Sequence, residues 1–262
     1  MLPRTLIIGD VHHHTDLADT LIHKHIGRYD QIVFLGDYFD EYRDSPAAMR
    51  ATCRWLVASL KEANRIHLLG NHDLAYLFPQ NPRARCPGHT PEKQAVFDEL
   101  LGHVPGTAFV TAIAIDSWLL SHAGVTATRS DRRSAAAVAE LLAAELTTLQ
   151  TGGDSWILDV ARARGGTAAQ GGPFWLDWNS EFRPVPGLNQ IVGHTPSRGA
   201  ARAKCLTKDG NHRAFELVEP SPWPRMTQLP QVGPEWASIN WCVDTAQVFV
   251  GLLENGCLEL LV

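Results

Sequence analysis

The chain has 262 residues, of which 45% are hydrophobic and 19% are charged, so it can bury a full core and is not intrinsically disordered. Its formal net charge of −5 gives no electrostatic signal for binding nucleic acid or an anionic membrane surface. No apolar run approaches the ~20 residues that a membrane-spanning helix needs. The five scattered cysteines lack a C-x-x-C pair and are typical of reduced thiols. We therefore expect a cytoplasmic protein.

The first seventy residues alternate between short apolar runs and helical patterns. The apolar runs, each followed by a glycine, predict strands at 5–8, 31–35 and 66–69. Helices are predicted at about 15–25, with Thr15 or Asp16 as the N-cap, and from Pro46 to about 63, with Ser45 as the N-cap. Strands that alternate with helices of this length predict a partly parallel sheet.

A mostly helical segment interrupts the strand pattern in the middle of the chain. Strands at 110–115 and 118–120 precede it, and it contains a helix at about 131–150 and a short helix between the glycine pairs near 152 and 166. Further strands are predicted at 190–192, 241–243, 247–253 and 258–262, with a proline-rich loop at 220–234. Strand signals at both ends favour one domain over residues 1–262, with residues 131–172 as a mostly helical insertion.

Five polar segments follow predicted strands. They are Gly9-Asp10-Val11-His12, Gly36-Asp37-Tyr38-Phe39-Asp40, Gly70-Asn71-His72-Asp73, Ser121-His122-Ala123-Gly124 and Gly193-His194-Thr195-Pro196. Ligands of open α/β sheets bind beyond the carboxyl ends of the strands, so we expect these segments to converge. Their carboxylate, imidazole and amide groups suit manganese, iron or zinc and are too rich in nitrogen for a calcium site. One such segment is common by chance, but five in this order predict a metal site.

The order D-x-H, G-D-x-x-D, G-N-H-D, H-A-G and G-H-T resembles the calcineurin-like metallophosphoesterase superfamily. The likeness is strongest to its phosphoprotein-phosphatase and diadenosine-tetraphosphatase branch, whose closing strands also resemble residues 242–252. Many other members end in G-H-x-H, whereas Pro196 stands at the last position here. The resemblance implies an α/β fold of two packed mixed β-sheets flanked by helices, a four-layer sandwich with a dinuclear site at one edge.

The resemblance also implies two divalent metal ions, with manganese preferred and iron or zinc as alternatives. The implied ligands are Asp10, His12 and Asp37 for one ion and Asp37, Asn71, His122 and His194 for the other. A carboxylate that bridges two ions suits the ~3.5–4 Å separation of two-metal hydrolysis, in which metal-activated water attacks directly. His72 would protonate the leaving oxygen, oriented by Asp40.

The substrate contacts are less well defined by the sequence. Glu41 stands where protein phosphatases usually have an arginine after G-D-x-x-D. The candidate substrate contacts are Arg43, Arg129, Tyr38 and His13, each of which also fits a loop or rim residue without a role. Tyr42 is a further candidate for stacking on a base, and Trp175 could line the pocket or pack in the core.

We therefore expect a metal-dependent phosphoesterase that hydrolyses phosphate monoesters, diesters or nucleotide anhydrides. Its partner would be a small phosphorylated substrate, with nucleotides included. One alternative is a serine/threonine-type phosphoprotein phosphatase, which Glu41 disfavours. The other is a non-catalytic metal-binding scaffold of the same fold, which the presence of all the implied ligands, His72 and Asp40 disfavours.

Overall fold

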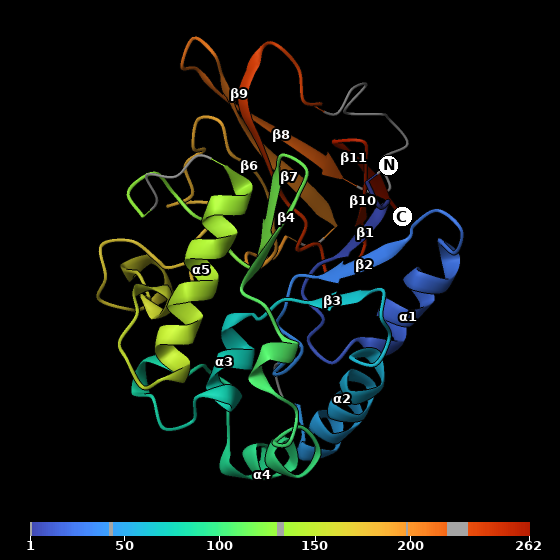
Figure 1. The fold of residues 1–262 in the computed structure, drawn as a ribbon, viewed down its shortest axis with the longest axis vertical. Helices are drawn as coiled ribbons and strands as arrows, with labels where there is room; N and C mark the ends of the chain where they lie inside the picture. The colour runs from blue at the N-terminus through green and yellow to red at the C-terminus, as the bar shows by residue number, and fades with distance from the viewer. Residues whose placement is uncertain (1, 42–43, 130–133, 198, 219–229) are drawn as a thin grey trace.

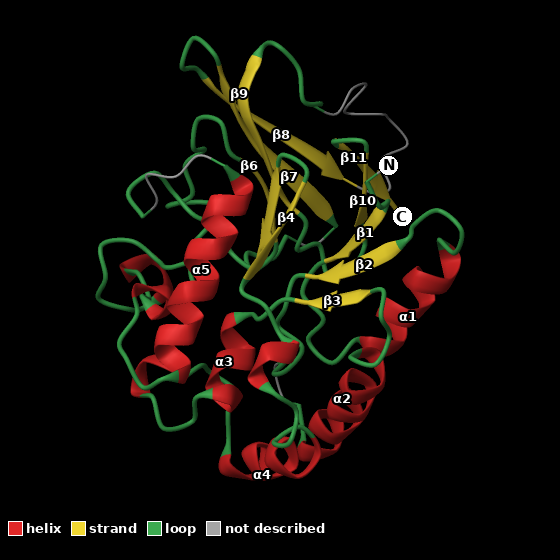
Figure 2. Ribbon diagram, in the orientation of Figure 1, coloured by secondary structure: helices red, strands yellow, loops and turns green. Residues whose placement is uncertain are grey.

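Two mixed β-sheets pack together in the computed structural model, with helices on their outer sides (Figure 1 and Figure 2). The structure describes residues 2–41, 44–129, 134–197, 199–218 and 230–262. The expected fold of two packed mixed sheets flanked by helices is thereby confirmed. Within the described ranges, no helix is long and apolar enough to cross a membrane.

The first sheet carries the three parallel strands that the sequence predicts. Its order is β11-β10-β1-β2-β3, and β10 and β11 add antiparallel strands beside β1. Leu6 of β1 pairs with Ile32 of β2 on one side and with Leu252 of β10 on the other. The strands are β1 (Thr5–Ile8), β2 (Gln31–Phe34), β3 (Arg65–His67), β10 (Val250–Glu254) and β11 (Cys257–Leu261).

The second sheet has the order β4-β5-β6-β9-β7-β8. Strands β5, β6 and β9 run parallel, whereas β4, β7 and β8 are antiparallel to their neighbours. Its strands are β4 (Ala112–Ile115), β5 (Trp118–Ser121), β6 (Asn189–Val192), β7 (Ala200–Thr207), β8 (His212–Val218) and β9 (Trp236–Cys242). The hairpin of β7 and β8 was not predicted from the sequence.

Of the two helices for which the sequence predicts a capping residue, one begins as predicted. The Ser45 hydroxyl accepts a hydrogen bond from the Ala48 amide at 3.3 Å, as predicted for an N-cap. The first helix instead follows His14, without a side-chain cap, so the prediction of Thr15 or Asp16 as cap was wrong. The α-helices are α1 (Thr15–Lys24), α2 (Pro46–Ser59), α3 (Asn71–Leu77), α4 (Pro91–Leu100) and α5 (Ala135–Gln150).

Four short 3-10 helices complete the described helical segments: η1 (Pro82–Ala84), η2 (Gly106–Ala108), η3 (Trp156–Leu158) and η4 (Arg162–Arg164). The last two replace the single short helix expected between the glycine pairs. Helix α2 ends at Ser59, earlier than the predicted end near residue 63. Most of the predicted loop at 220–234 and the start of the predicted helix at 131–150 lie outside the described residues.

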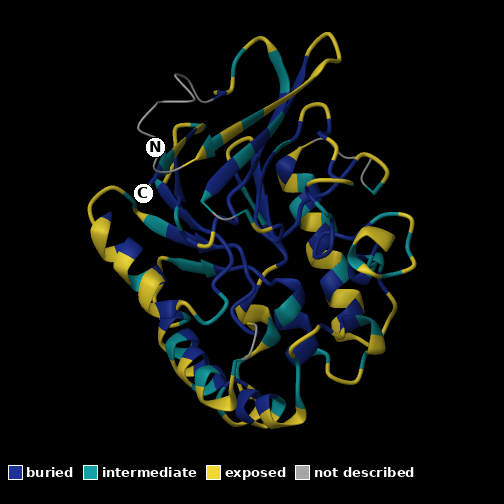
Figure 3. Ribbon diagram, turned by 180° about the vertical axis from the view of Figure 1, so that it is seen from behind, coloured by how far each residue is buried: buried dark blue, intermediate teal, exposed yellow. Residues whose placement is uncertain are grey.

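The core lies on both faces of the sheets because the strand residues alternate between them. Ile7 and Val33 belong to the apolar cluster between the two sheets, together with Leu120 and Ile191 of the second sheet. Leu6 belongs to the cluster that includes residues of the covering helices. Strands β1, β2 and β10 of the first sheet are largely buried (Figure 3). A strand buried on both faces reads as a continuous apolar run, which is why these strands were predictable.

Candidate metal centre

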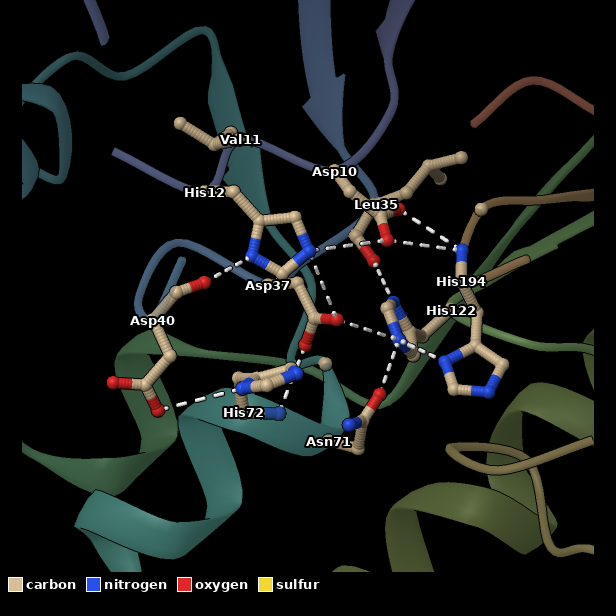
Figure 4. A network of polar contacts seen from close by, with 12 residues as sticks. Asp10, Val11, His12, Leu35, Asp37, Asp40, Asn71, His72, His122 and His194 are labelled. Atoms are coloured by element: carbon tan, nitrogen blue, oxygen red, sulfur yellow. Dashed lines mark hydrogen bonds and ion pairs between the residues drawn. The ribbon is translucent and has the colours of Figure 1, made fainter. Parts of the chain in front are cut away.

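All five polar segments lie at the carboxyl ends of strands, as expected. Asp10 follows β1, Asp37 follows β2 and Asn71 opens α3 after β3. The other two segments come from the second sheet, where His122 follows β5 and His194 follows β6. Figure 4 shows their side chains converging on one point. The site is therefore built where the edges of the two sheets meet.

Sharp backbone turns aim these side chains at the centre. His12, Asp37 and His194 have left-handed φ angles of 40°, 51° and 66°. A non-glycine residue in this conformation costs on the order of 1–3 kcal/mol and persists only where the surroundings enforce it. Gly70 lets the loops approach, because a Cβ atom there would overlap the Asp37 carboxylate. The surroundings thus hold these residues in a strained backbone conformation that fixes the direction of their side chains.

The carboxylate of Asp37 is shared by two groups of potential metal ligands. In each group the ligand atoms lie within 4.8 Å of one another, and the groups are Asp10, His12 and Asp37, and Asp37, His122 and His194. Asp37 Oδ2 lies 3.7 Å from His12 Nε2 and 3.4 Å from His122 Nε2. This arrangement matches a carboxylate that bridges two adjacent ions.

Hydrogen bonds behind the ligands determine which atoms face the centre. His12 Nδ1 lies 2.6 Å from the Asp40 carbonyl oxygen, and His122 Nδ1 lies 2.9 Å from that of Leu35. A nitrogen facing a carbonyl carries the proton, so Nε2 of each ring keeps its lone pair for an ion. Asn71 donates its Nδ2 to Cys86 Sγ at 3.2 Å, which turns Oδ1 towards the centre.

The atoms around His122 Nε2 show whether a cation fits at this point. Its Nε2 lies 3.0 Å from Asn71 Oδ1 and 3.1 Å from His194 Nδ1, with Asp37 Oδ2 close by. Acceptor atoms at these distances repel one another unless a proton or a metal ion lies among them. The residues present therefore fit a bound divalent cation.

The carboxylates give the centre a strongly negative potential. Burial lowers the pKa of His12, but Asp37 and Asp10 outweigh it and raise that pKa to about 9. The same balance raises the pKa of His122 to about 10. Burial, followed by repulsion from Asp244, holds the pKa of the Asp10 carboxyl well above its usual range. Asp244, which sequence reasoning did not assign to the site, thus adds negative charge beside the first ligand group.

Asp73 holds two of the ligand segments together. Its carboxylate accepts hydrogen bonds from the backbone amides of Asp37 and Tyr38, both at 2.9 Å, and of Gly70 at 2.7 Å. Burial and the nearby Asp37 raise the pKa of this carboxyl to about 7. The sequence motif contained Asp73, but its role could not be inferred without the contact between the loops.

His72 and Asp40 lie side by side next to the centre. His72 Nδ1 is 3.3 Å from Asp40 Oδ2, and the His72 amide donates to Asp37 Oδ1 at 2.9 Å. Asp40 Oδ1 accepts from the Tyr76 hydroxyl at 2.6 Å. The side chain of His72 is partly exposed and lines the adjoining cavity.

A cavity of about 740 Å³ opens over the centre. Besides potential ligands and the pair of His72 and Asp40, its lining includes Glu41, Asp44, Asp244, Arg164 and Trp175. Arg164 donates to the Thr195 hydroxyl at 2.8 Å and pairs with Asp177 at 3.0 Å. The sequence offered no signal for Arg164, because it lies in the weakly patterned stretch before residue 172.

The candidate substrate contacts of the sequence analysis need correction. Tyr38 is fully buried and its hydroxyl lies 3.0 Å from His67 Nδ1, so it cannot stack on a substrate. Arg129 is bound by Asp159 and by the Gln170 carbonyl oxygen rather than facing the cavity. His13 is also turned inward. Arg43 and Tyr42 lie outside the described residues.

Hydrogen bonds from neighbouring residues hold His13 behind the cavity wall. Its Nδ1 lies 2.8 Å from the Thr52 hydroxyl, and its Nε2 lies 2.8 Å from Asp44 Oδ2. The next residue, His14, lines the cavity and lies near Glu41, with 3.3 Å between its Nε2 and Glu41 Oε1. Of the two histidines after His12, the second is therefore the rim residue.

The chain was compared with family models and with solved structures. A family model described as calcineurin-like phosphoesterase matches residues 3–198. The chain is similar in structure to a proposed diadenosine tetraphosphatase, with 17% identity, a TM-score of 0.41 and coverage of 100% of this chain and 94% of that chain. A second similar structure is a protein serine/threonine phosphatase from Saccharomyces cerevisiae with similarity to human phosphatase PP5. It shows 12% identity, a TM-score of 0.44 and coverage of 98% of this chain and 79% of that chain. No curated protein matches the chain.

We expect the purified chain to bind two manganese ions, and Asp37→Asn to weaken the binding of both because it removes the shared charge. Apparent affinity should rise with pH until about pH 10, because His12, with a pKa of about 9, and His122, with a pKa of about 10, must lose their protons before they bind an ion. Calorimetric titration at several pH values measures both quantities. Glu62→Gln, an exposed change outside the described cavity lining, is the control. Unchanged stoichiometry and affinity in Asp37→Asn would contradict the assignment.

Proposed function

Because the chain belongs to the calcineurin-like phosphoesterase family, we propose that it hydrolyses phosphoesters or nucleotide phosphoanhydrides with two divalent ions. The sharing of Asp37 between two groups of ligand atoms is the observation that carries the proposal. The proposed ligands are Asp10, His12, Asp37, Asn71, His122 and His194. Their mixed oxygen and nitrogen donors suit manganese, with iron or zinc as alternatives.

When bound, the two ions supply an activated water nucleophile and neutralise charge on the phosphoryl group. The chain adds Arg164, which lines the cavity. Its terminal nitrogen contacts Thr195 and Asp177, which hold the planar group in place. We assign Arg164 to binding a non-bridging phosphate oxygen, since arginine forms strong charge-assisted hydrogen bonds with phosphate.

His72 is the proposed proton donor to the leaving oxygen. Asp40 accepts the Nδ1 proton of its ring, so Nε2 is available on the cavity side. An imidazole oriented by a carboxylate is an effective general acid near neutral pH. The backbone amide of His72 is bound to Asp37, which ties the position of the proton donor to that of the shared ligand.

We expect His72→Asn to bind manganese normally but to lose about 10²–10⁴ in turnover of alkyl phosphate esters, the usual worth of general acid–base catalysis. The loss should be much smaller for nitrophenyl esters, whose leaving group needs little protonation. Steady-state rates for a series of esters measure this difference. An equal loss across the series would remove His72 from this role.

The absence of turnover in the manganese-loaded wild type, with every phosphate monoester, diester and anhydride tested, would favour a non-catalytic scaffold.

Arg164→Met should lower kcat/KM about 10- to 100-fold, the equivalent of losing one charge-assisted hydrogen bond of about 1.5–3 kcal/mol. Arg129→Met is the matched control, because its guanidinium is engaged by Asp159 and Gln170. It should change kcat/KM less than threefold once thermal unfolding shows that the variant is folded. Equal losses in the two variants would show that Arg164 acts through the fold rather than on the substrate.

Glu41 makes the cavity less suited to a dianionic substrate. It lines the cavity and is half-exposed beside His14. A phosphate monoester near pH 7 is a dianion, whereas each internal diester phosphate carries one charge. Repulsion by the Glu41 carboxylate therefore supports diesters or small nucleotide anhydrides over phosphoserine peptides.

Glu41→Arg should raise monoester turnover relative to diester turnover, because it reverses the charge that faces the phosphate. Glu41→Gln, which removes the charge without adding a cation, should give an intermediate ratio. Rates on a phosphoserine peptide and on a nitrophenyl phosphodiester measure that ratio. A wild-type preference for the peptide, unchanged in both variants, would contradict the argument from charge.

A further inference from the structure

A buried lysine lies behind the cavity wall. The side chain of Lys93 on α4 is 4% exposed, and its Nζ lies 2.7 Å from Asp40 Oδ1. The same nitrogen lies 2.7 Å and 2.9 Å from the two carboxylate oxygens of Asp44. An ammonium group has three protons to donate, and these three oxygens can accept all of them. Lys93 therefore has no proton left for a substrate, and any effect on the reaction passes through its partners.

The two carboxylate oxygens of Asp40 have different partners. Oδ1 receives Lys93 and the Tyr76 hydroxyl, while Oδ2 faces His72 Nδ1. Two strong donors on one oxygen fix the rotation of the carboxylate. The other oxygen is then held in the plane where it can accept the proton of the His72 ring.

The negative charges of Asp40 and Asp44 also require a cation between them, and Lys93 supplies it. Asp40 and Asp44 are both nearly buried and both contact its ammonium. Buried carboxylates are stable as anions only when they are paired, so loss of the lysine would drive these two apart or neutralise one of them. Glu41 occupies the place where an arginine was expected in front of the phosphate. The cation next to Asp40 instead comes from α4 and lies behind the carboxylates.

We propose that Lys93 is the positioning residue that holds Asp40 in the orientation required by His72, an inference that rests on the proposed function. A purely structural lysine would only attach α4 to the rest of the fold. Arg50 provides that comparison, because it joins α2 to α4 through Glu99 at 2.6 Å on the surface. Lys93 and Arg50 both anchor α4, but Lys93 contacts the pair of Asp40 and His72.

Turnover of a series of esters in saturating manganese tests the proposal. Lys93→Met should slow alkyl esters about 10- to 100-fold, part of the usual worth of general acid catalysis, and nitrophenyl esters less than threefold. Lys93→Arg should recover part of the alkyl-ester rate, and Arg50→Met should behave as the wild type. Equal losses for all esters in Lys93→Met would overturn the proposal.

The double variant Lys93→Met with Asp44→Asn separates positioning from stability. Removing the Asp44 charge should restore thermal stability, because the repulsion between the two carboxylates disappears. The alkyl-ester rate should stay low, because Asp40 still lacks its lysine contact. Recovery of that rate together with stability would show that Lys93 only balances charge.

Nuclear magnetic resonance of the zinc-loaded protein gives a readout that needs no turnover. The proton on His72 Nδ1, identified by its loss in His72→Asn, should give a downfield signal in the wild type and in Arg50→Met. The signal should disappear in Lys93→Met as the hydrogen bond to Asp40 is lost. An unchanged signal would overturn the proposal. An inactive wild type in which Lys93→Met alone loses the signal would instead contradict the proposed function while supporting the positioning role.

Discussion

The rest of the centre depends on the hydrogen bonds that the carboxylate of Asp73 accepts. It binds the backbone amides of Asp37 and Tyr38 from one loop and that of Gly70 from the next. Buried amides must find acceptors, so these three hydrogen bonds fix the spacing between the carboxyl ends of β2 and β3. Asp37 belongs to both ligand groups and also binds the His72 amide. One buried acid thus sets the positions of Asp37 and of His72 together.

The strands that could be predicted are those that form short, continuous apolar runs in the sequence. Strands β1 to β3 appear in the sequence as apolar runs that end at glycines, and the Ser45-Pro46 pair marks the start of α2. Strand β8 was missed because most of its residues are exposed and its apolar alternation is weak. The turn at Asp209-Gly210 was the available signal, since this pair favours hairpins.

The site was predictable to the extent that its residues follow strands. The six proposed ligands, His72 and Asp40 lie together because strand ends converge at one edge. Cys86, Lys93 and Arg164 reach the same region from a loop, from α4 and from the end of η4, where no local pattern marks them. Tyr38 was misjudged because its motif lies at the site while its ring points into the core. Spacing along the chain gives the place of a loop but not the direction of each side chain in it.

The pairing of β1 with β10 has a consequence for the order of assembly during synthesis. Leu6, close to the proposed ligand Asp10, pairs in register with Leu252, almost at the other end of the chain. A ribosome adds about 5–20 residues per second, so β10 is synthesised on the order of ten seconds or more after β1. Until then one edge of β1 is unpaired, and the nascent chain exposes an apolar strand that chaperones or other chains can bind.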